Sequence, residues 1–380
     1  MRKIVNLGLL FLSYLVSILL KKPIIWGYPS FVSIEPTNHC NLRCPECPTG
    51  QSGLTRDSGS LKQQDFTRFI DQLIPQLAYL TLYFQGEPYL NKELFRFISY
   101  ARSRSVYTWT STNGHFLTEN NIKETIQSGL NKLIISLDGT DQKAYEQYRI
   151  GGSYDTVVNG IRNFVRIRKE MDSRKPLLEI QFLVLKSNQH QIKEIRKLGN
   201  SLGADRTLLK TAQFYDFEQG NPLMPEEGKW SRYKPRKEGR RKKDEGRGTR
   251  DEGRRMRDEG RRMRDEGRGK REEEMKKHQS RVTSHQSQVT DHGSRIPDAR
   301  FRIKNPLPNR CFRMWSGCVI TWNGKVVPCC FDKDAEHCLG DLSTQSFKEI
   351  WKGDKYQRFR QAILNNRKSI DICRNCSQRW

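Results

Sequence analysis

Three cysteines stand close together near the amino end of the chain, with the spacing C-x3-C-x2-C. They are Cys40, Cys44 and Cys47. Thiolates are the usual protein ligands of iron–sulfur clusters and structural zinc. A closed site needs four protein ligands, and a missing ligand leaves an open position where chemistry can occur. The residues alone leave two interpretations: an iron–sulfur cluster with one open iron, or a zinc knuckle completed by His39 or a distant cysteine.

Polar motifs follow the next three β-rich runs of the sequence. These motifs are Gln85-Gly86-Glu87-Pro88, Ser111-Thr112-Asn113-Gly114 and Asp138-Gly139. Each one alone is equally explained as an ordinary turn or helix start. In parallel α/β folds, however, ligands gather at the carboxyl ends of strands. A glycine there allows close backbone approach, and a carboxylate suits an ammonium group. The set therefore predicts one binding site around the cysteine loop.

Residues 30–211 must supply the elements that position these motifs. Short β-rich runs alternate there with helical patterns, as in βαβ units with a parallel sheet. The predicted strands are 31–36, 79–84, 106–111, 132–137, 178–185 and 206–210. The predicted helices are 62–76, 91–104, 118–128, 153–171 and 189–200. Six such units fit a (β/α)6 partial barrel, and an open doubly wound sheet fits the periodicity equally well.

The other seven cysteines lie between 311 and 376, in a segment of different character. Its spacing reads Cys311-x12-Gly324-x4-Cys329-Cys330, followed by Cys338 and a final Cys373-x2-Cys376 pair. The Asn-Gly pair between β-formers in 321–327 predicts a hairpin, and 346–364 has the pattern of an amphipathic helix. A hairpin that leads into a Pro-Cys-Cys turn, with a returning C-x2-C pair, can close a four-thiolate site. A zinc ribbon is the alternative.

The two cysteine segments resemble two known families. The loop of Cys40, Cys44 and Cys47 is similar to the cluster motif of radical S-adenosylmethionine (SAM) enzymes. The carboxyl-terminal segment resembles the SPASM domain of such enzymes, or its shorter twitch form. The resemblance covers 30–211 and 305–380. It implies a partial (β/α)6 TIM-like barrel with a small cysteine-rich α+β domain. It also implies a [4Fe–4S] cluster whose open iron binds SAM, which is cleaved on reduction to a 5′-deoxyadenosyl radical.

The resemblance further implies site residues. The SAM contacts would come from Gly86, Glu87, Pro88, Ser111, Asn113 and Asp138. The ligands of one auxiliary [4Fe–4S] cluster would be Cys311, Cys329, Cys373 and Cys376, with Cys330 the competitor for the place of Cys329. We expect Cys318 and Cys338 to be spare, because free cysteine also behaves as a small buried hydrophobe. The chain departs from the family at Glu46, where an aromatic residue near the adenine is common.

Between these segments lies a low-complexity insertion, predicted over 228–304. Residues 244–271 repeat with period seven, but a glycine in every repeat and the near absence of apolar residues exclude a coiled coil. This composition predicts disorder. Residues 228–300 carry 25 Lys and Arg against 14 Asp and Glu, a net +11 of the chain's +25. About half of the basicity therefore lies outside the predicted domains, and we expect no specific nucleic-acid binding.

An apolar segment stands at the amino end, within the predicted unit 1–24. Residues 4–20 carry no charge and lie between Arg2-Lys3 and Lys21-Lys22. Seventeen residues is the lower limit for crossing a bilayer, and no small-residue cleavage site follows. Asn6, Ser13 and Ser17 fall on one helical face. The pattern fits a helix in the membrane interface and equally a helix packed on the barrel.

The expected protein is thus a radical SAM enzyme with its barrel over 25–227 and its SPASM-like domain over 305–380. Ten cysteines in an α/β sequence of this kind indicate a reducing compartment, so we expect it in the cytoplasm, with membrane association through 4–20 left open. A peptide or protein is the first expected substrate, and a small-molecule, lipid-linked or cell-envelope substrate the second. An electron donor such as flavodoxin or ferredoxin is implied. The competing class is a non-enzymatic zinc protein that binds nucleic acid.

Overall fold

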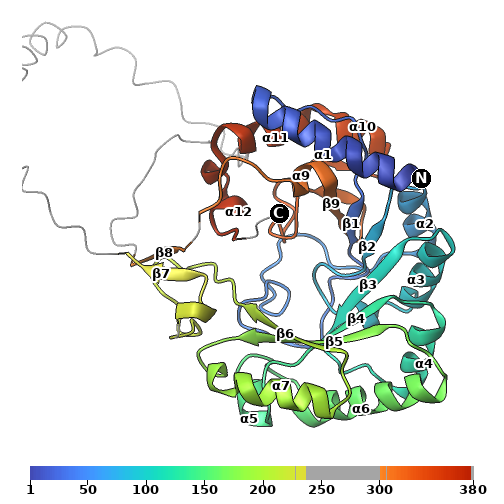
Figure 1. The fold of residues 1–380 in the computed structure, drawn as a ribbon, viewed down its shortest axis with the longest axis vertical. Helices are drawn as coiled ribbons and strands as arrows, with labels where there is room; N and C mark the ends of the chain where they lie inside the picture. The colour runs from blue at the N-terminus through green and yellow to red at the C-terminus, as the bar shows by residue number, and fades with distance from the viewer. Residues whose placement is uncertain (227, 237–299, 305, 378–380) are drawn as a thin grey trace, which may run out of the picture. The chain divides into compact units, whose positions relative to one another are not determined.

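Six parallel strands follow one another in the sheet in the order of the chain. Figure 1 shows the computed structural model, which describes residues 1–226, 228–236, 300–304 and 306–377. The strands are β1 (Phe31–Ile34), β2 (Tyr79–Thr81), β3 (Tyr107–Thr112), β4 (Lys132–Ser136), β5 (Leu177–Val184) and β6 (Arg206–Thr211). A doubly wound sheet would reverse its strand order at a switch point. The unbroken order confirms the (β/α)6 partial barrel.

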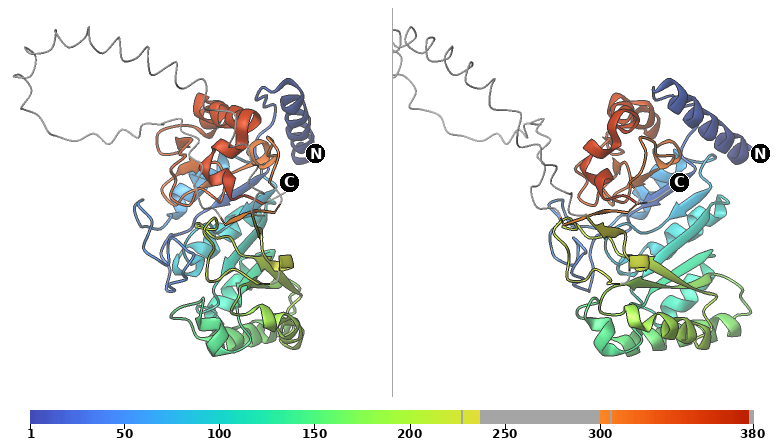
Figure 2. Two further views of the ribbon diagram at one scale, coloured as in Figure 1. Left: turned by 90° about the vertical axis from the view of Figure 1, so that its left-hand side faces the viewer. Right: turned by 60° about the vertical axis from the view of Figure 1, so that its left-hand side comes forward.

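The helices between these strands cover the outer face of the sheet (Figures 1 and 2). They are α2 (Gln63–Asp71), α3 (Leu94–Ser103), α4 (Glu119–Gln127), α5 (Gln142–Glu146), α6 (Tyr154–Glu170) and α7 (Ile192–Ser201), with the short turns η1 (Pro88–Leu90) and η2 (Gln189–Gln191). Side-chain caps set three of the helix starts, because Thr118 accepts from Asn121 N, Asp141 from Ala144 N and Ser153 from Thr156 N. Each helix then packs its apolar stripe on the strands.

The barrel core is formed by aliphatic strands beneath aromatic helix residues. Leu133 and Ile135 of β4 are fully buried, as are Phe97 of α3 and Phe164 of α6. Strands covered by helices read as continuous apolar runs, and Leu133-Ile134-Ile135 is such a run. This packing holds the carboxyl ends of the strands in a fixed arc, where the motifs predicted from the sequence lie.

The carboxyl-terminal segment extends the same sheet. Strand β9 pairs in parallel with β1, with Phe31 opposite Gly317 and Ile34 opposite Ile320, and β10 and β11 continue the sheet in antiparallel fashion. The elements of this segment are α9 (Arg313–Ser316), β9 (Gly317–Ile320), β10 (Lys325–Val327), β11 (Gly340–Asp341), α10 (Phe347–Lys352), α11 (Asp354–Asn366), η4 (Arg367–Ser369) and α12 (Asp371–Arg374). Strands from both cysteine segments therefore belong to one nine-stranded sheet.

The helix predicted over 346–364 is in fact two helices, α10 and α11. The break is at Gly353, whose extended backbone (ψ 163°) cannot continue a helix. The start is close to the prediction, because Ser346 and Glu349 form a capping box at the beginning of α10. The hairpin predicted over 321–327 is present, and its Gly324 has a φ of +87°.

Both ends of the predicted insertion are ordered where the structure describes them. Residues inside the predicted 228–304 form η3 (Gly228–Trp230), β7 (Tyr233–Pro235) and β8 (Phe301–Ile303), and β7 pairs with β8. The predicted bounds of the insertion, 228–304, are thus too wide at both ends. The physical reason is that Tyr233 is buried and stacks on Phe217 with ring centroids 4.7 Å apart. The repeats at 244–271 lie outside the described residues.

A long apolar helix, α1 (Arg2–Leu20), precedes β1 and packs on α9. The rings of Tyr14 and Trp315 lie 5.4 Å apart, and Tyr14 also contacts Phe312. Within the described residues, α1 is the one helix long and apolar enough to cross a membrane, and 28% of its apolar window is buried. Length and composition alone do not decide between a span, a surface helix and a packed helix.

Candidate iron–sulfur and SAM site

The three cysteines of the amino-terminal motif lie together on the loop after β1. Cys47 N donates to Cys44 O over 3.1 Å, and Gly50 folds back so closely that a Cβ there would stand 2.6 Å from Cys44 N. Burial, together with the neighbouring Glu87, Cys44 and Cys47, raises the pKa of Cys40 to about 11. The pKa of Cys44 is raised by burial as well. A metal centre is therefore needed to hold these groups as thiolates.

Apolar side chains enclose this loop. Cys40 and Cys47 pack against a buried cluster of mostly apolar side chains. Its members are Leu42, Cys44, Tyr148, Leu185, Ala212, Phe214, Phe217, Met224 and Tyr233. The segment after β6 thus covers the cysteines. Glu46, which departs from the family pattern, accepts a hydrogen bond from Asn221 Nδ2 over 2.8 Å. This hydrogen bond connects the segment after β6 to the cysteine loop.

Gly86 and Glu87, in the motif after β2, bind the cysteine loop directly. Gly86 has a φ of +74°, and a Cβ there would meet Thr37 O at 2.5 Å and His39 O at 2.7 Å. Glu87 N donates to His39 O over 2.7 Å. Gly86 therefore allows its own backbone to lie close to the backbone of the cysteine loop. From the sequence we had expected it to allow the backbone to lie close to a ligand. His39, the alternative zinc ligand, has an exposed side chain.

The Glu87 carboxylate ties the loop after β2 to the end of β3. It accepts from Thr112 Oγ1 (2.8 Å), Asn113 N (2.7 Å) and Tyr89 N (3.2 Å). Burial raises the pKa of Glu87 to about 7, and these donors oppose the rise. A carboxylate offers about four acceptor positions, so one is left for another donor. Pro88, the remaining predicted residue of this motif, starts η1.

Asn113 contacts the cysteine loop, and Ser111 lies on the opposite face of β3 from the intervening Thr112. Asn113 Nδ2 donates to Asn41 Oδ1 over 2.7 Å. Thr112 is buried and contacts Glu87, while Ser111 is half-buried on the other face of β3. Adjacent strand residues point to opposite faces. Thr112 is thus a site residue that the sequence reasoning missed, although it stands inside the quoted motif.

Asp138, after β4, is held by an arginine that the sequence reasoning also missed. Arg149 Nε donates to Asp138 Oδ2 over 2.6 Å, and Leu183 N donates to Asp138 Oδ1 over 2.6 Å. Arg149 Nη1 lies 3.8 Å from Cys44 Sγ. Burial opposes the charge of Arg149, but Asp138 and Cys44 outweigh it and raise its pKa. No local motif marks Arg149, which follows α5.

The carboxyl-terminal cysteines come together from three separate segments. Cys329, after β10, interacts electrostatically with Cys311, which precedes α9. Cys373, in α12, interacts with Cys311 and Cys376, and burial raises its pKa to about 12. These are the four cysteines predicted as ligands. Cys318 is fully buried in β9, and the half-buried Cys338 contacts Gly340 O through its Sγ.

Cys329 and Cys330 lie next to each other and share Arg313 as a neighbour. Cys330 also interacts with Tyr83, after β2, and with Arg232. Cys329 also interacts with Cys311 and with Tyr356 of α11. Cys329 therefore stays the proposed fourth ligand, with Cys330 as its competitor.

Three arginines surround this second cysteine group. Arg313 interacts with Cys330, Cys329 and Cys311; Arg367 interacts with Cys311, Cys376 and Cys373; and Arg232 interacts with Cys376 and Cys330. Arg367 Nη2 also donates to Cys376 Sγ over 3.3 Å.

Each of these guanidinium groups contains a buried nitrogen without a hydrogen-bond partner among the described residues. The atoms are Arg232 Nη1, Arg313 Nε and Arg367 Nε. Buried cations require a compensating anion. A cluster bound by four thiolates is such an anion, so the residues present fit an auxiliary iron–sulfur cluster. Among all the described residues, those of both cysteine groups included, no three His, Cys, Asp or Glu side chains converge on one metal-ion position.

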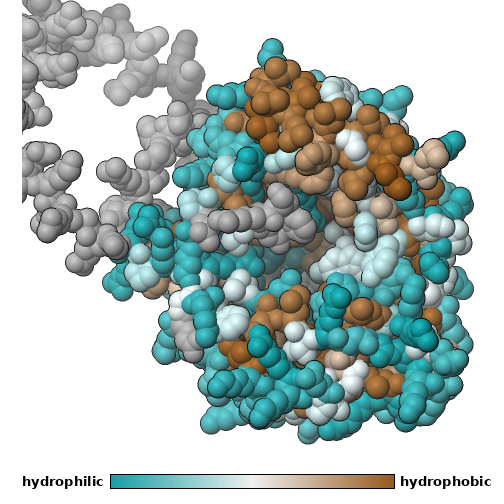
Figure 3. Space-filling model, viewed as in Figure 1, coloured by the Kyte–Doolittle hydropathy of each residue, from teal (hydrophilic) through white to brown (hydrophobic). Residues whose placement is uncertain are grey.

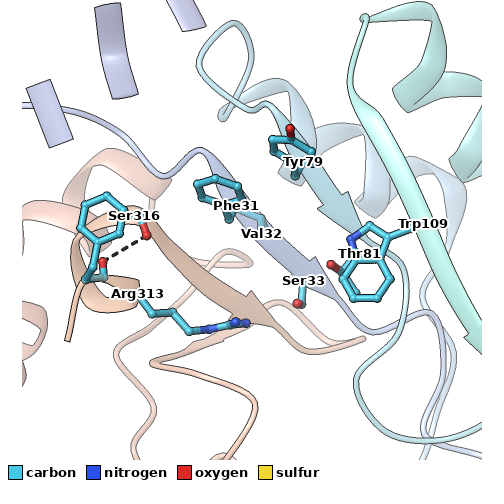
Figure 4. A pocket seen from close by; sticks show the side chains of 9 residues that line it. Phe31, Val32, Ser33, Tyr79, Thr81, Trp109, Arg313 and Ser316 are labelled. Atoms are coloured by element: carbon cyan, nitrogen blue, oxygen red, sulfur yellow. Dashed lines mark hydrogen bonds between the residues drawn. The ribbon is translucent and has the colours of Figure 1, made fainter. Parts of the chain in front are cut away.

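A mostly apolar cavity lies between β1, β2, β3 and α9. Its volume is about 290 Å³, and its walls include Phe31, Tyr79, Trp109 and Phe312 (Figure 4). Phe31 stacks on Tyr79 with ring centroids 5.1 Å apart. Arg313 extends along the cavity from α9. The cavity also reaches Ser33 of β1, Thr81 at the end of β2 and Trp109 of β3.

Comparison with known proteins identifies both cysteine segments. The model of the radical SAM superfamily matches residues 34–173, and that of the SPASM iron–sulfur cluster-binding domain matches 311–377. The PqqA peptide cyclase of Bradyrhizobium diazoefficiens is 26% identical over 203 residues, which cover 53% of this chain and 51% of that protein. A tungsten-containing aldehyde ferredoxin oxidoreductase cofactor-modifying protein of Pyrococcus furiosus is 25% identical over 198 residues (51% and 54%). The matches span about half the length of these relatives.

The fold also matches solved structures. Streptococcus suis SuiB bound to S-adenosylmethionine superposes with a TM-score of 0.55 at 15% identity, covering 88% of this chain and 68% of that one. SuiB bound to its precursor peptide SuiA gives a TM-score of 0.55 at 14% identity, covering 88% and 67%. At this identity the likeness establishes a common fold.

Proposed function

This chain belongs to the radical SAM superfamily and carries a SPASM domain at its carboxyl end, and from that premise we propose that it cleaves SAM reductively and abstracts a hydrogen atom from a substrate. The observation that carries the proposal is the position of Cys40, Cys44 and Cys47 on one loop at the carboxyl end of β1. The loops after β2, β3 and β4 all contact that loop. Three thiols leave one iron of a [4Fe–4S] cluster for SAM.

The bound cluster and SAM supply the one-electron cleavage and the carbon radical, while the protein positions and shields them. In this chain Cys40, Cys44 and Cys47 hold the cluster. Arg149 places a fixed positive charge beside Cys44, and Asp138 orients that guanidinium.

Around SAM, we assign the amino-group contact to Glu87, whose carboxylate retains one acceptor position. Gly86 and Pro88 shape its loop, and Ser111 and Asn113 lie at the end of β3 for the ribose and methionyl groups. Phe214 and Phe217 keep water from the loop.

A peptide is the substrate class that we propose first. Among the relatives, PqqA peptide cyclase is named for a peptide substrate, and SuiB has been solved with a precursor peptide. The chain outside 228–300 carries a net charge of about +14, which suits an acidic peptide. In this assignment Cys311, Cys329, Cys373 and Cys376 would hold the auxiliary cluster, which would supply electron transfer from the substrate or a place to anchor it.

A lipid-linked substrate is the second candidate, favoured by one specific observation. Phe312 lines the aromatic cavity and also contacts Phe11 and Tyr14 of the apolar helix α1. An apolar chain that reaches the protein beside α1 would find Phe31, Tyr79 and Trp109 next to it. The non-enzymatic zinc protein is not retained, because the radical SAM and SPASM models match the two cysteine segments.

The proposed setting is the cytoplasm, with peripheral membrane contact through 4–20 and an electron donor such as flavodoxin or ferredoxin. The ten cysteines, all of which lie within the described residues, form no disulfide with one another. A reducing compartment keeps both thiols and clusters in the required state.

Metal content and SAM cleavage test the proposed chemistry together. Anaerobically reconstituted wild type should contain about eight irons per chain, and a Cys40/Cys44/Cys47→Ala variant about four. Only the wild type should release 5′-deoxyadenosine after reduction. Four irons in wild type and none in the variant would remove the auxiliary cluster. Zinc without iron in both proteins would refute the radical mechanism.

Isotope transfer distinguishes the two substrate classes. Extract from cells grown in deuterated medium is separated into peptide and lipid fractions, and each is incubated with the reduced enzyme and SAM. Deuterium in the released 5′-deoxyadenosine marks the fraction that donates the hydrogen atom. Transfer from the peptide fraction alone supports the first candidate, and transfer from the lipid fraction alone replaces it with the second.

A further inference from the structure

Helix α1 packs on the protein through its polar face. Its buried residues are Asn6, Leu10, Ser13, Tyr14 and Ser17. Asn6 Nδ2 donates to Tyr28 O over 2.7 Å, and Asn6 Oδ1 accepts from Tyr28 N over 2.8 Å. Ser17 Oγ accepts from Ile24 N (2.9 Å) and from Trp315 Nε1 (3.0 Å). The polar side chains on this face of α1 thus find their hydrogen-bond partners within the chain.

The opposite face of α1 is apolar and exposed. Its exposed side chains are Ile4, Val5, Leu7, Leu9, Phe11, Leu12, Leu15, Leu19 and Leu20. Ile4 is 78% exposed and Leu19 is 80% exposed. Figure 3 shows apolar surface gathered over this helix. A surface helix of a water-soluble protein has the reverse arrangement, with its apolar stripe inside. A contiguous patch of this kind marks a site that an apolar partner covers.

The charges at the ends of the helix identify the partner. Arg2 precedes the apolar face, Lys21 and Lys22 follow it, all three are exposed, and α1 contains no acidic residue. Basic residues close to an anionic membrane surface are attracted to its negative potential and strengthen binding. Trp26, 47% exposed, follows the second basic pair, and tryptophan is enriched at membrane interfaces.

We propose that α1 lies flat in the interface of an anionic lipid bilayer and buries its outward face among the acyl chains. The contacts of Asn6 and Ser17 argue against a span, because crossing the bilayer would break them and place three polar side chains in hydrocarbon. Nineteen residues also measure only about 28 Å, close to the minimum for spanning. This surface does not depend on the proposed radical chemistry.

Vesicle flotation of the full-length holoprotein tests the surface. Wild type should float with phosphatidylcholine vesicles that contain 30% phosphatidylglycerol, and at least tenfold less should float with pure phosphatidylcholine or in 0.5 M NaCl. An Ile4→Glu/Leu12→Glu/Leu19→Glu variant should lose at least tenfold of its binding, because it places three charges in the buried face. These side chains are exposed, so the fold should be kept.

A matched control carries the same change of charge elsewhere. Asn120, Gln127 and Asn200 are exposed polar residues on the outer helices, and their replacement by glutamate should leave vesicle binding within twofold of wild type. Equal binding by the α1 variant and wild type, or no binding by wild type, would overturn the proposal. So would a wild-type dimer that becomes monomeric in the α1 variant, because a second copy would then cover the face.

Alkaline carbonate extraction separates a flat helix from a spanning one. We expect the bound protein to be released from the vesicles, and retention would overturn the interfacial placement. The same preparations are assayed for 5′-deoxyadenosine release. Loss of that activity with intact flotation would count against the proposed function and leave the membrane surface standing.

Discussion

The Nη1 nitrogen of Arg149 lies 3.8 Å from the sulfur of Cys44, in the centre of the proposed SAM-cluster site. The same guanidinium is bonded to the buried Asp138 over 2.6 Å. A single cation therefore serves both a cysteine of the cluster loop and the acidic residue after β4. Asp138 therefore orients Arg149, and this role does not depend on a contact between Asp138 and SAM.

Replacing Arg149 by glutamine should destabilise the protein by about 3 kcal/mol, because it leaves Asp138 buried without its partner. Iron retention at the first cluster should fall as well. Urea unfolding and iron analysis measure the two effects. The double variant Arg149→Gln/Asp138→Asn should recover most of the stability but not the iron. Unchanged iron retention in both variants would show that Arg149 has no role toward Cys44.

Replacing Gly86 by alanine should damage the site more than the same change at Gly151. Both glycines have a positive φ, +74° and +84°, so both variants carry a backbone penalty of about 1 kcal/mol. Only at Gly86 does a Cβ meet backbone, at 2.5 Å from Thr37 O, whereas Gly151 faces open space. Thermal unfolding and iron content should separate the two variants, and equal behaviour would contradict the packing described for Gly86.

The ligand set of the auxiliary cluster predicts a pattern of iron loss. Alanine at Cys373 or Cys329 should reduce the iron content from about eight to about four per chain. Alanine at Cys318 should leave the iron unchanged, because that thiol is buried in the core of β9. Alanine at Cys330 should also retain the iron. Loss of iron from the Cys330 variant with retention in the Cys329 variant would exchange their assignments.

Arg367 should raise the reduction potential of the auxiliary cluster. Its Nη2 donates to Cys376 Sγ over 3.3 Å, and a nearby positive charge favours the more negative, reduced state. A redox titration followed by electron paramagnetic resonance should show a lower potential for Arg367→Gln than for wild type. The exposed Arg358 on α11 offers a control, and Arg358→Gln should not shift the potential. An unshifted potential in Arg367→Gln would contradict the assignment.

Asp205 should contribute stability that disappears in acid. Burial by itself raises its pKa, but hydrogen bonds from Arg168 and from Leu178 N outweigh burial and lower it. A lowered folded-state pKa means that stability is present above the ordinary value of 3.8 and is lost as the pH falls through the folded value. Urea unfolding of wild type and Asp205→Asn should therefore differ at pH 7, and the difference should shrink below about pH 4. A difference that is independent of pH would contradict this.

The strands, the order of the motifs and the cysteines that are candidate cluster ligands can all be predicted from the amino-acid sequence. These are local properties: a β-rich run, a C-x3-C-x2-C spacing and an Asn-Gly turn all depend on residues close together in the chain. The six barrel strands and the motif at each strand end follow from that information. The family resemblance then distinguished the barrel from a doubly wound sheet.

Which distant groups meet depends on the folded arrangement of the chain. The pairing of β9 with β1, the contact of Arg149 with Cys44, and the three arginines around the second cysteine group join residues that no local pattern relates. The two sides of α1 show the same limit. Periodicity placed Asn6, Ser13 and Ser17 on one face, but whether that face turns inward depends on hydrogen-bond partners such as Tyr28 and Trp315, which come from other parts of the fold.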